Sequence, residues 1–158
     1  MPRAEELLTI LTSSGRPFRV LEHVEARTAV EAAEARGTPL AHGAKSLLLR
    51  AERVGNVVIV GGSDRRIEGR LLRRALRIQR YRFLSAEELY EVAGLHHGEL
   101  PAFARPLFDA ELVVGEDFLE RGEVVFAAAS AARSVGMAVA DWLAVAQPRV
   151  VPTFTVAG

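Results

Sequence analysis

A single lysine, Lys45, stands among nineteen arginines in this chain of 158 residues. A lysine ammonium is a compact charge on a flexible stem, whereas an arginine guanidinium is a flat fork that is always charged. A position that keeps lysine where arginine is otherwise used is expected to need the size, the three donors or the adjustable pKa of an ammonium. We therefore take Lys45 as the leading candidate for a catalytic group. The alternative is chance, or a lysine that fits one crowded position.

Arginines dominate the middle of the chain. Residues 45–82 carry eleven basic and three acidic side chains, a net charge of +8 in a protein that is neutral overall. Four arginines recur here at spacings that share one face of a predicted helix: Arg66, Arg70, Arg73 and Arg77. A face of one sign suits the phosphate backbone of RNA, to which it gives affinity without reading sequence. The alternative is a solvated helix face.

None of the four histidines has a neighbour at the spacing of a metal site, so we expect no metal; they are His23, His42, His96 and His97. The last two lie between Gly94 and Gly98. Two glycines four residues apart let backbone N–H groups turn toward a ligand, where they could stabilise an oxyanion. The same segment is also compatible with a surface loop that follows a helix, with Gly94 as the C-cap.

Several other kinds of site are missing from the sequence. There is no cysteine, which excludes disulfides, thiolate metal ligands and cysteine nucleophiles. Gly43-Ala44-Lys45-Ser46 is not the end of a phosphate-binding loop, because Ala44 replaces the second glycine. Ser46 has no histidine base in a recognisable arrangement, so we expect a strand residue there. With no signal peptide and no apolar run as long as a membrane span, we expect a cytoplasmic protein.

Local patterns predict the elements that would hold these groups. Helices are expected where apolar residues recur every three or four positions or where a capping box opens the segment: residues 2–13, 28–35, 64–77, 85–93 and 140–146. Strands are expected where β-branched and apolar residues alternate or cluster: residues 18–21, 46–50, 57–61, 80–84, 111–114, 124–128 and 135–139. The tail from Pro148 could add an edge strand.

These elements intermix without strict alternation, which favours one mixed sheet surrounded by helices over a doubly wound parallel sheet. A chain of this length with 49% hydrophobic residues can bury a substantial core. No repeat or linker divides it. We therefore expect a single domain over residues 1–158, of the α+β or mixed α/β class.

Several short motifs occur in the order and spacing of one known family: Ala44-Lys45-Ser46-Leu47-Leu48-Leu49, Gly61-Gly62-Ser63-Asp64-Arg65-Arg66-Ile67-Glu68, Ser85-Ala86-Glu87-Glu88-Leu89, Gly94-x-x-x-Gly98-x-x-Pro101-x-Phe103, and the Phe126–Ser130 strand end before Val135. In these motifs the chain resembles the YbaK/EbsC-type aminoacyl-tRNA deacylases, relatives of the editing domain of bacterial prolyl-tRNA synthetases. The likeness covers about residues 18–145.

The resemblance implies a fold, a reaction and a site. The fold is a mixed α/β domain with a curved sheet. The reaction is hydrolysis of the ester between a wrong, small amino acid (Cys or Ala) and the 3′-terminal ribose of a tRNA, usually tRNA(Pro). The functional lysine of the family maps onto Lys45. The arginine face would hold the acceptor end of the tRNA, and no metal or cofactor is implied.

The resemblance also maps a set of substrate-binding residues: Thr28, Gly94, His96, His97, Gly98, Pro101, Phe103, Ala129 and Ser130. Three positions depart from the family pattern. Ala102-Phe103-Ala104 stands where Pro-Phe-Gly is usual, Gly115 replaces an aspartate, and Ala129 replaces a glycine. We expect these changes to affect amino-acid specificity more than the reaction class. If Ala129 faces the pocket, its methyl group would favour small side chains.

Two other functions stay open. One is a non-catalytic tRNA- or RNA-binding module of the same fold, and the other is a protein that binds a small molecule or nucleotide in the pocket alone. Retention of Lys45 favours the enzyme over the first, and the arginine face argues against the second. The need for prolyl-tRNA synthetase as a partner and the choice between monomer and homodimer also stay open.

Overall fold

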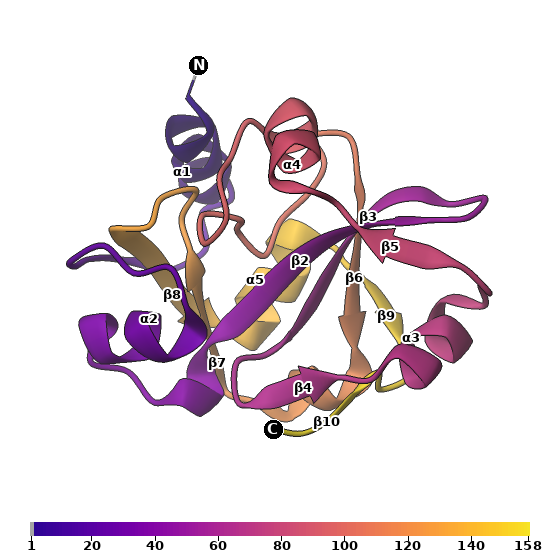
Figure 1. Ribbon diagram of the computed structural model, residues 1–158. Helices are drawn as coiled ribbons and strands as arrows, with labels where there is room; N and C mark the ends of the chain where they lie inside the picture. The colour runs from indigo at the N-terminus through magenta and orange to yellow at the C-terminus, as the bar shows by residue number, and fades with distance from the viewer. Residues whose placement is uncertain (1) are drawn as a thin grey trace.

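A five-stranded mixed sheet forms the centre of the molecule (Figure 1). The structure is a computed structural model that describes residues 2–158. In sheet order the strands are β5 (Tyr81–Phe83), β2 (Ala44–Ala51), β3 (Gly55–Gly62), β6 (Glu111–Gly115) and β9 (Arg149–Val151). β2 is antiparallel to β3 and β5, whereas β6 runs parallel to β3 and β9. The predicted mixed sheet is confirmed.

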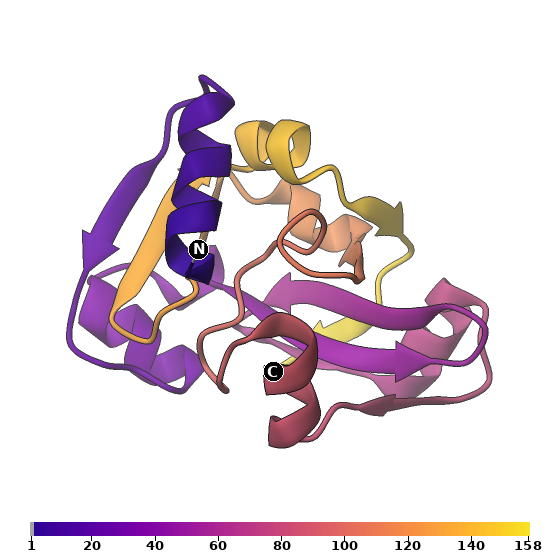
Figure 2. The ribbon, with the colours of Figure 1, turned by 90° about the horizontal axis from the view of Figure 1, so that it is seen from above.

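Two smaller sheets complete the strand arrangement of the described residues. One joins β1 (Arg19–Glu22), β8 (Arg133–Ala138) and β7 (Glu123–Ala127) in antiparallel order, and the other pairs β4 (Arg65–Ile67) with β10 (Thr155–Ala157). Figures 1 and 2 show the three-stranded sheet at the opposite end of the molecule from the turn between β2 and β3. The strands expected in one sheet are therefore divided among three.

Five α-helices and two short 3-10 helices surround the sheets within residues 2–158: α1 (Arg3–Ser13), α2 (Ala29–Arg36), α3 (Gly69–Leu76), α4 (Ala86–Ala93), α5 (Val139–Ala146), η1 (Leu40–His42) and η2 (Glu116–Glu120). Predicted caps fix two of the starts. The hydroxyl of Thr28 accepts the N–H of Glu31 at the start of α2, and Ser85 with Glu88 forms a capping box on α4. No helix of this set is both long and apolar enough to cross a membrane.

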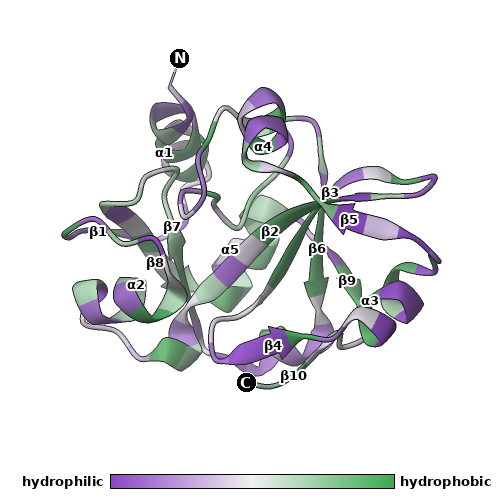
Figure 3. Cartoon of the chain, viewed as in Figure 1, coloured by the Kyte–Doolittle hydropathy of each residue, from purple (hydrophilic) through white to green (hydrophobic). Residues whose placement is uncertain are grey.

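Apolar clusters cover both faces of the central sheet. The larger contains Phe103, Phe126 and Trp142, and the smaller lies under α3 and contains Phe154. Side chains alternate along a strand, so Leu48 of β2 packs in the larger cluster, while its neighbours Leu47 and Leu49 pack in the smaller cluster on the other face. Figure 3 shows hydrophobic residues along the inner strands and hydrophilic residues on α3 and β4.

The helix expected over residues 64–77 was wrong in its first third. Residues 65–67 form β4, and α3 begins only at Gly69, with Glu68 as its N-cap. Arg66 therefore lies on a strand, and Arg77 is the left-handed C-cap of α3, so the four predicted arginines do not share one helical face. Pairing of β4 with the C-terminal strand β10 overrides the local helical pattern.

Candidate active site

A cavity of about 540 Å³ lies between α2, the first half of β2 and the loop that follows α4. Its volume is in the usual range for small-molecule sites. The ionisable side chains that line it are those of His23, Arg27, Arg36, Lys45 and His97. No carboxylate among residues 2–158 lines the cavity. Its electrostatic character therefore favours a ligand that carries negative charge.

The unpaired edge of β2 forms one wall of this cavity. β5 pairs with β2 only from Leu49 to Ala51, so the preceding residues have no strand on that side. The N–H of Leu84 donates to the carbonyl of Leu48 at 3.1 Å, which shows that the backbone groups of Leu48 point away from β3. By the alternation of an antiparallel ladder, those of Ser46 do the same. Ser46 thus turns a backbone N–H and a C=O toward the cavity.

Lys45 and Ser46 extend from this edge to opposite faces of the strand. The Oγ of Ser46 is buried and has no hydrogen-bond partner within residues 2–158. The Nζ of Lys45 donates to the carbonyl of Arg65, which leaves two of its three N–H donors for a ligand. Burial lowers the pKa of Lys45 from its usual value, and the nearby Asp64 carboxylate partly opposes that shift.

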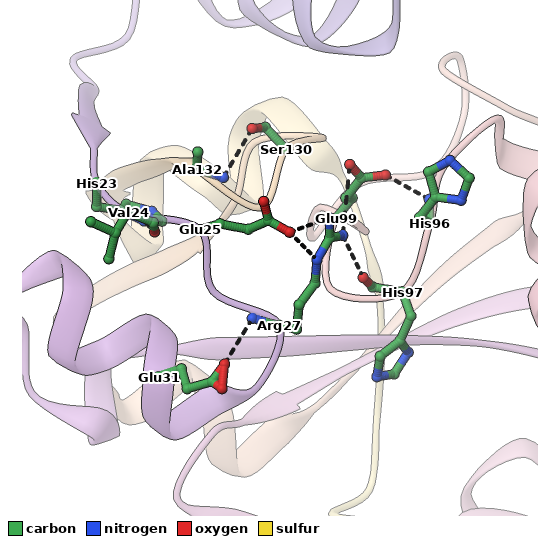
Figure 4. A network of polar contacts seen from close by, with 10 residues as sticks. All are labelled: His23, Val24, Glu25, Arg27, Glu31, His96, His97, Glu99, Ser130 and Ala132. Carbon is green, nitrogen blue, oxygen red and sulfur yellow. Dashed lines mark hydrogen bonds and ion pairs between the residues drawn. The ribbon is translucent and has the colours of Figure 1, made fainter.

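Arg27 fastens the loop after α4 to the start of α2 (Figure 4). Its guanidinium donates to the carbonyl of His97 at 3.0 Å and to Glu25 at 2.9 Å, and it lies 3.9 Å from Glu99. Gly98 packs directly against it. The φ of Gly98 is +89°, and a Cβ there would lie 3.1 Å from the Cα of Arg27. Both the backbone conformation and the close approach therefore require glycine.

A polar trio that no sequence pattern indicated also borders the cavity: His23, Arg36 and Ser134. The Oγ of Ser134 lies 2.8 Å from the Nε of Arg36 and 2.8 Å from the Nε2 of His23. Burial lowers the pKa of Arg36 to about 10. Ser134 is 98 positions from Arg36 and 111 from His23 along the chain, so no local spacing could have revealed the group.

Residues 23–145 match the family model of the aminoacyl-tRNA editing domain. The chain belongs to this family. It is 29% identical over 153 residues to the multifunctional Ser/Thr-tRNA deacylase ProXp-y of Escherichia coli (strain K12), which covers 93% of this chain and 90% of the relative. The predicted resemblance to YbaK-type deacylases is confirmed.

Solved structures show the same fold. One is a candidate trans-editing enzyme for prolyl tRNA synthetase, with 24% identity, a TM-score of 0.81, and coverage of 97% of this chain and 98% of that one. Another is the hypothetical protein APE2540, with 21% identity, a TM-score of 0.84, and coverage of 96% and 99%. The mixed-sheet editing-domain fold expected from the sequence is therefore confirmed.

Five residues predicted for the site of this editing domain line the cavity: Thr28, Lys45, His97, Gly98 and Ser130. The hydroxyl groups of Thr28 and Ser130 each accept a backbone N–H two or three residues along the chain, at 3.2 and 3.0 Å. Local turns and caps therefore hold these two side chains in place. Within residues 2–158 no three histidine or carboxylate side chains gather closely enough to bind a metal ion.

The other predicted substrate-binding residues lie outside the cavity wall: Gly94, His96, Pro101, Phe103 and Ala129. Gly94 is the left-handed C-cap of α4, and the exposed His96 stacks on Tyr90 at 5.1 Å. Pro101 and Phe103 are buried. Ala129 has a φ of 59° and packs against the larger apolar cluster, so the condition that its methyl group faces the pocket is not met. Substrate contact by these residues stays a prediction.

The predicted RNA-binding arginines lie on the exposed surface around α3, away from the cavity: Arg66, Arg70, Arg73 and Arg77. None of them forms an ion pair within residues 2–158. The carboxylate of Glu68 caps α3 by accepting the N–H of Leu71 at 2.8 Å. The local acid is thus used by the helix, and the surface stays strongly positive.

Proposed function

We propose that this editing domain hydrolyses the ester between a mischarged small amino acid and the 3′-terminal ribose of a tRNA. The observation that carries the proposal is the cavity at the unpaired edge of β2, which Lys45, Ser46 and Gly98 line without any carboxylate. An ester is already activated, so a site that orients water and stabilises an oxyanion is sufficient. Similarity to a Ser/Thr-tRNA deacylase supports the same reaction class.

Lys45 is the proposed catalytic residue. Water adds to the acyl carbon, and an Nζ–H of Lys45 donates to the oxyanion that develops on the carbonyl oxygen. The bond from the acyl carbon to the ribose oxygen then breaks. The ribose oxygen takes up the proton that water loses, with help from the neighbouring ribose hydroxyl. The products are the free amino acid and the uncharged tRNA, and no protein nucleophile is needed.

The proposed amino acids are small, and a hydroxyl group suits the site. Short side chains border the cavity, among them Ala29, Ala32 and Ala44. The unpartnered Oγ of Ser46 can donate to or accept from a substrate hydroxyl. We therefore add Ser and Thr to the Cys and Ala expected from the family, in keeping with the relative described as a Ser/Thr-tRNA deacylase. The proposed tRNA remains tRNA(Pro).

The arginines around α3 are proposed to bind the sugar–phosphate backbone near the acceptor end. They are exposed and unpaired, so they can contact phosphates without first breaking ion pairs. We propose that the protein acts in trans on free mischarged tRNA.

The test is a deacylation assay with purified protein and tRNA(Pro) charged in turn with Ser, Thr, Ala, Cys or Pro. We expect hydrolysis of at least one small non-cognate ester and much slower loss of Pro. A reaction without protein gives the spontaneous rate. If no ester is lost faster than that rate, the enzyme proposal fails. Binding of tRNA without hydrolysis would then favour the RNA-binding module of the same fold.

A further inference from the structure

The guanidinium of Arg36 borders the cavity without a carboxylate partner. Arg36 ends α2, and Ala29 and Ala32 on the same helical face leave space beside it. Arg36 forms no ion pair within residues 2–158. A charge taken out of water without a counter-ion destabilises the fold. A ligand that supplies the missing negative charge explains why the chain keeps arginine here.

His23 and Ser134 hold this guanidinium in position. The Nδ1 of His23 lies 2.7 Å from the carbonyl of Val24, which can only accept, so the neutral ring carries its proton on Nδ1 and a lone pair on Nε2. The Ser134 hydroxyl then donates to Nε2, and its oxygen accepts from the Nε of Arg36, each at 2.8 Å. One Nη1 N–H lies 3.5 Å from the carbonyl of Val125. The remaining guanidinium donors are available to a ligand.

The hydrogen-bonded Ser134–His23 pair is not suited to nucleophilic catalysis. Ser134 is only 1% exposed, so a substrate carbonyl has little access to its oxygen. That oxygen also accepts from a guanidinium, which makes it a weaker nucleophile. The hydrogen bonds of the pair instead fix the orientation of the Arg36 guanidinium.

We propose that Arg36 forms the centre of a phosphate-binding subsite in this cavity. Two N–H donors of a guanidinium match two oxygens of a phosphate. The phosphate would be that of the terminal nucleotide, an assignment that rests on the proposed function. An aminoacyl ester has no free carboxylate, so phosphate is the anion that such a substrate brings. Lys45, on the β2 wall, is then left for the carbonyl oxygen.

Binding of adenosine 5′-monophosphate and of adenosine tests this subsite without turnover. In calorimetric titration of the unaltered protein, the monophosphate is expected to bind at least about tenfold more tightly than adenosine, because charge-assisted hydrogen bonds are strong. In Arg36→Gln the two ligands are expected to bind equally. Arg36→Lys keeps part of the preference, since the charge remains without the fork. Arg105→Gln, at an exposed arginine paired with Asp109, is the control and keeps all of it.

Equal binding of the two ligands to the unaltered protein, or an unchanged preference in Arg36→Gln, would overturn the subsite. If Arg36→Gln does not fold, Arg36→Lys and Ser134→Ala provide the test. Both variants are expected to reduce the preference for the monophosphate over adenosine. An unchanged preference in both would contradict the subsite. The two proposals fail separately. If the protein prefers the monophosphate but hydrolyses no ester, the deacylase proposal fails and the subsite proposal stands. If it hydrolyses an ester but shows no preference for the monophosphate, only the subsite proposal fails.

Discussion

Lys45 and Ser46 are consecutive residues whose side chains lie on opposite faces of β2, yet both line one cavity. This is possible because the strand has no neighbour at that point, so the cavity extends around its edge. We propose that the ammonium of Lys45 and the unpartnered hydroxyl of Ser46 contact one ligand from adjacent positions. We infer that the first acts on the ester and the second on the amino-acid side chain.

Ser46→Ala tests that division at the scale of one residue. Loss of the Oγ removes a hydrogen bond that a Ser ester can form and an Ala ester cannot. The ratio of kcat/KM for Ser-tRNA over Ala-tRNA is expected to fall about two- to tenfold. Ser14→Ala is the control, because Ser14 lies outside the cavity wall and its hydroxyl donates to the carbonyl of Leu11, so the ratio should change little. An unchanged ratio in Ser46→Ala would show that Ser46 does not contribute to the choice between Ser and Ala esters.

At the scale of elements, the cavity depends on contacts between segments that are distant in sequence. Arg27, just before α2, bonds to the carbonyl of His97 in the loop after α4. Gly98 lets the two backbones approach to van der Waals contact. This part of the cavity wall therefore depends on the contact between Arg27 and the loop after α4. A substitution at Gly98 should lower activity by displacing that loop.

Gly98→Ala combines an unfavourable left-handed backbone with a tight contact of 3.1 Å between the new Cβ and the Cα of Arg27. We expect a loss of about 1–3 kcal/mol in the free energy of unfolding and a large fall in deacylation rate. Gly94→Ala has the same backbone strain, but its new Cβ would meet only the Arg3 side chain, at 3.6 Å. Urea denaturation should show a smaller loss for Gly94→Ala, of about 1 kcal/mol. Equal losses in the two variants would contradict the proposed contact.

Glu88 joins α4 to β2 and β5, which supply the apolar side of the cavity. It pairs with Arg82 at 2.7 Å and with Arg50 at 3.1 Å. These contacts, with Arg82 first and the Ser85 cap next, hold its pKa well below the usual range. A carboxyl with a depressed folded-state pKa adds stability above its unfolded pKa of about 4.3 and loses it as the pH falls further.

Glu88→Gln is therefore expected to lower the melting temperature at pH 7, and the difference from the unaltered protein should shrink steadily below about pH 4. Melting curves across this pH range measure the effect. Glu87→Gln is the neighbouring control, since Glu87 forms no ion pair within residues 2–158. If Glu88→Gln lowers the melting temperature by the same amount at every pH, packing and not charge joins α4 to the sheet.

At the scale of the whole molecule, zero net charge conceals a division of charge between regions. The excess positive charge of residues 45–82 lies on β4, α3 and the turn between β2 and β3. Figure 1 shows α3 and α2 at opposite ends of the molecule, so the arginine surface is separate from the cavity. A tRNA that binds both would place its backbone on the surface and its 3′ end in the cavity.

The double variant Arg70→Gln, Arg73→Gln tests this surface. Removal of each arginine–phosphate interaction should reduce the slope of log affinity against log salt concentration by about 0.7–0.9, so the double variant should lose about 1.4–1.8. Filter binding of uncharged tRNA at several salt concentrations measures that slope, while binding of adenosine 5′-monophosphate should be unaffected. Arg105→Gln is the control on another exposed surface. An unchanged slope would show that these α3 arginines do not contact the phosphates of tRNA.

Features of the fold that depend on neighbouring residues could be predicted from the sequence, and features that depend on distant pairing could not. The caps of α2 and α4 rest on spacings of three residues: both N-cap side chains form the predicted bond, although the full capping box forms only on α4. The helix over residues 64–77 was wrong because β4 pairs with the far end of the chain. The unpaired edge at Ser46 exists only because β5 stops at Phe83, and Arg36 meets Ser134 only through the tertiary fold.

The rate of ester hydrolysis by Lys45 variants under single-turnover conditions tests the central claim most directly. Unaltered protein, Lys45→Ala and Lys45→Arg are mixed with the mischarged tRNA that is hydrolysed fastest, and circular dichroism confirms that each is folded. We predict a fall of about a hundredfold to a thousandfold in Lys45→Ala. Lys45→Arg should recover little of it, because the planar fork does not replace the ammonium. Hydrolysis by Lys45→Ala at the unaltered rate would contradict the account.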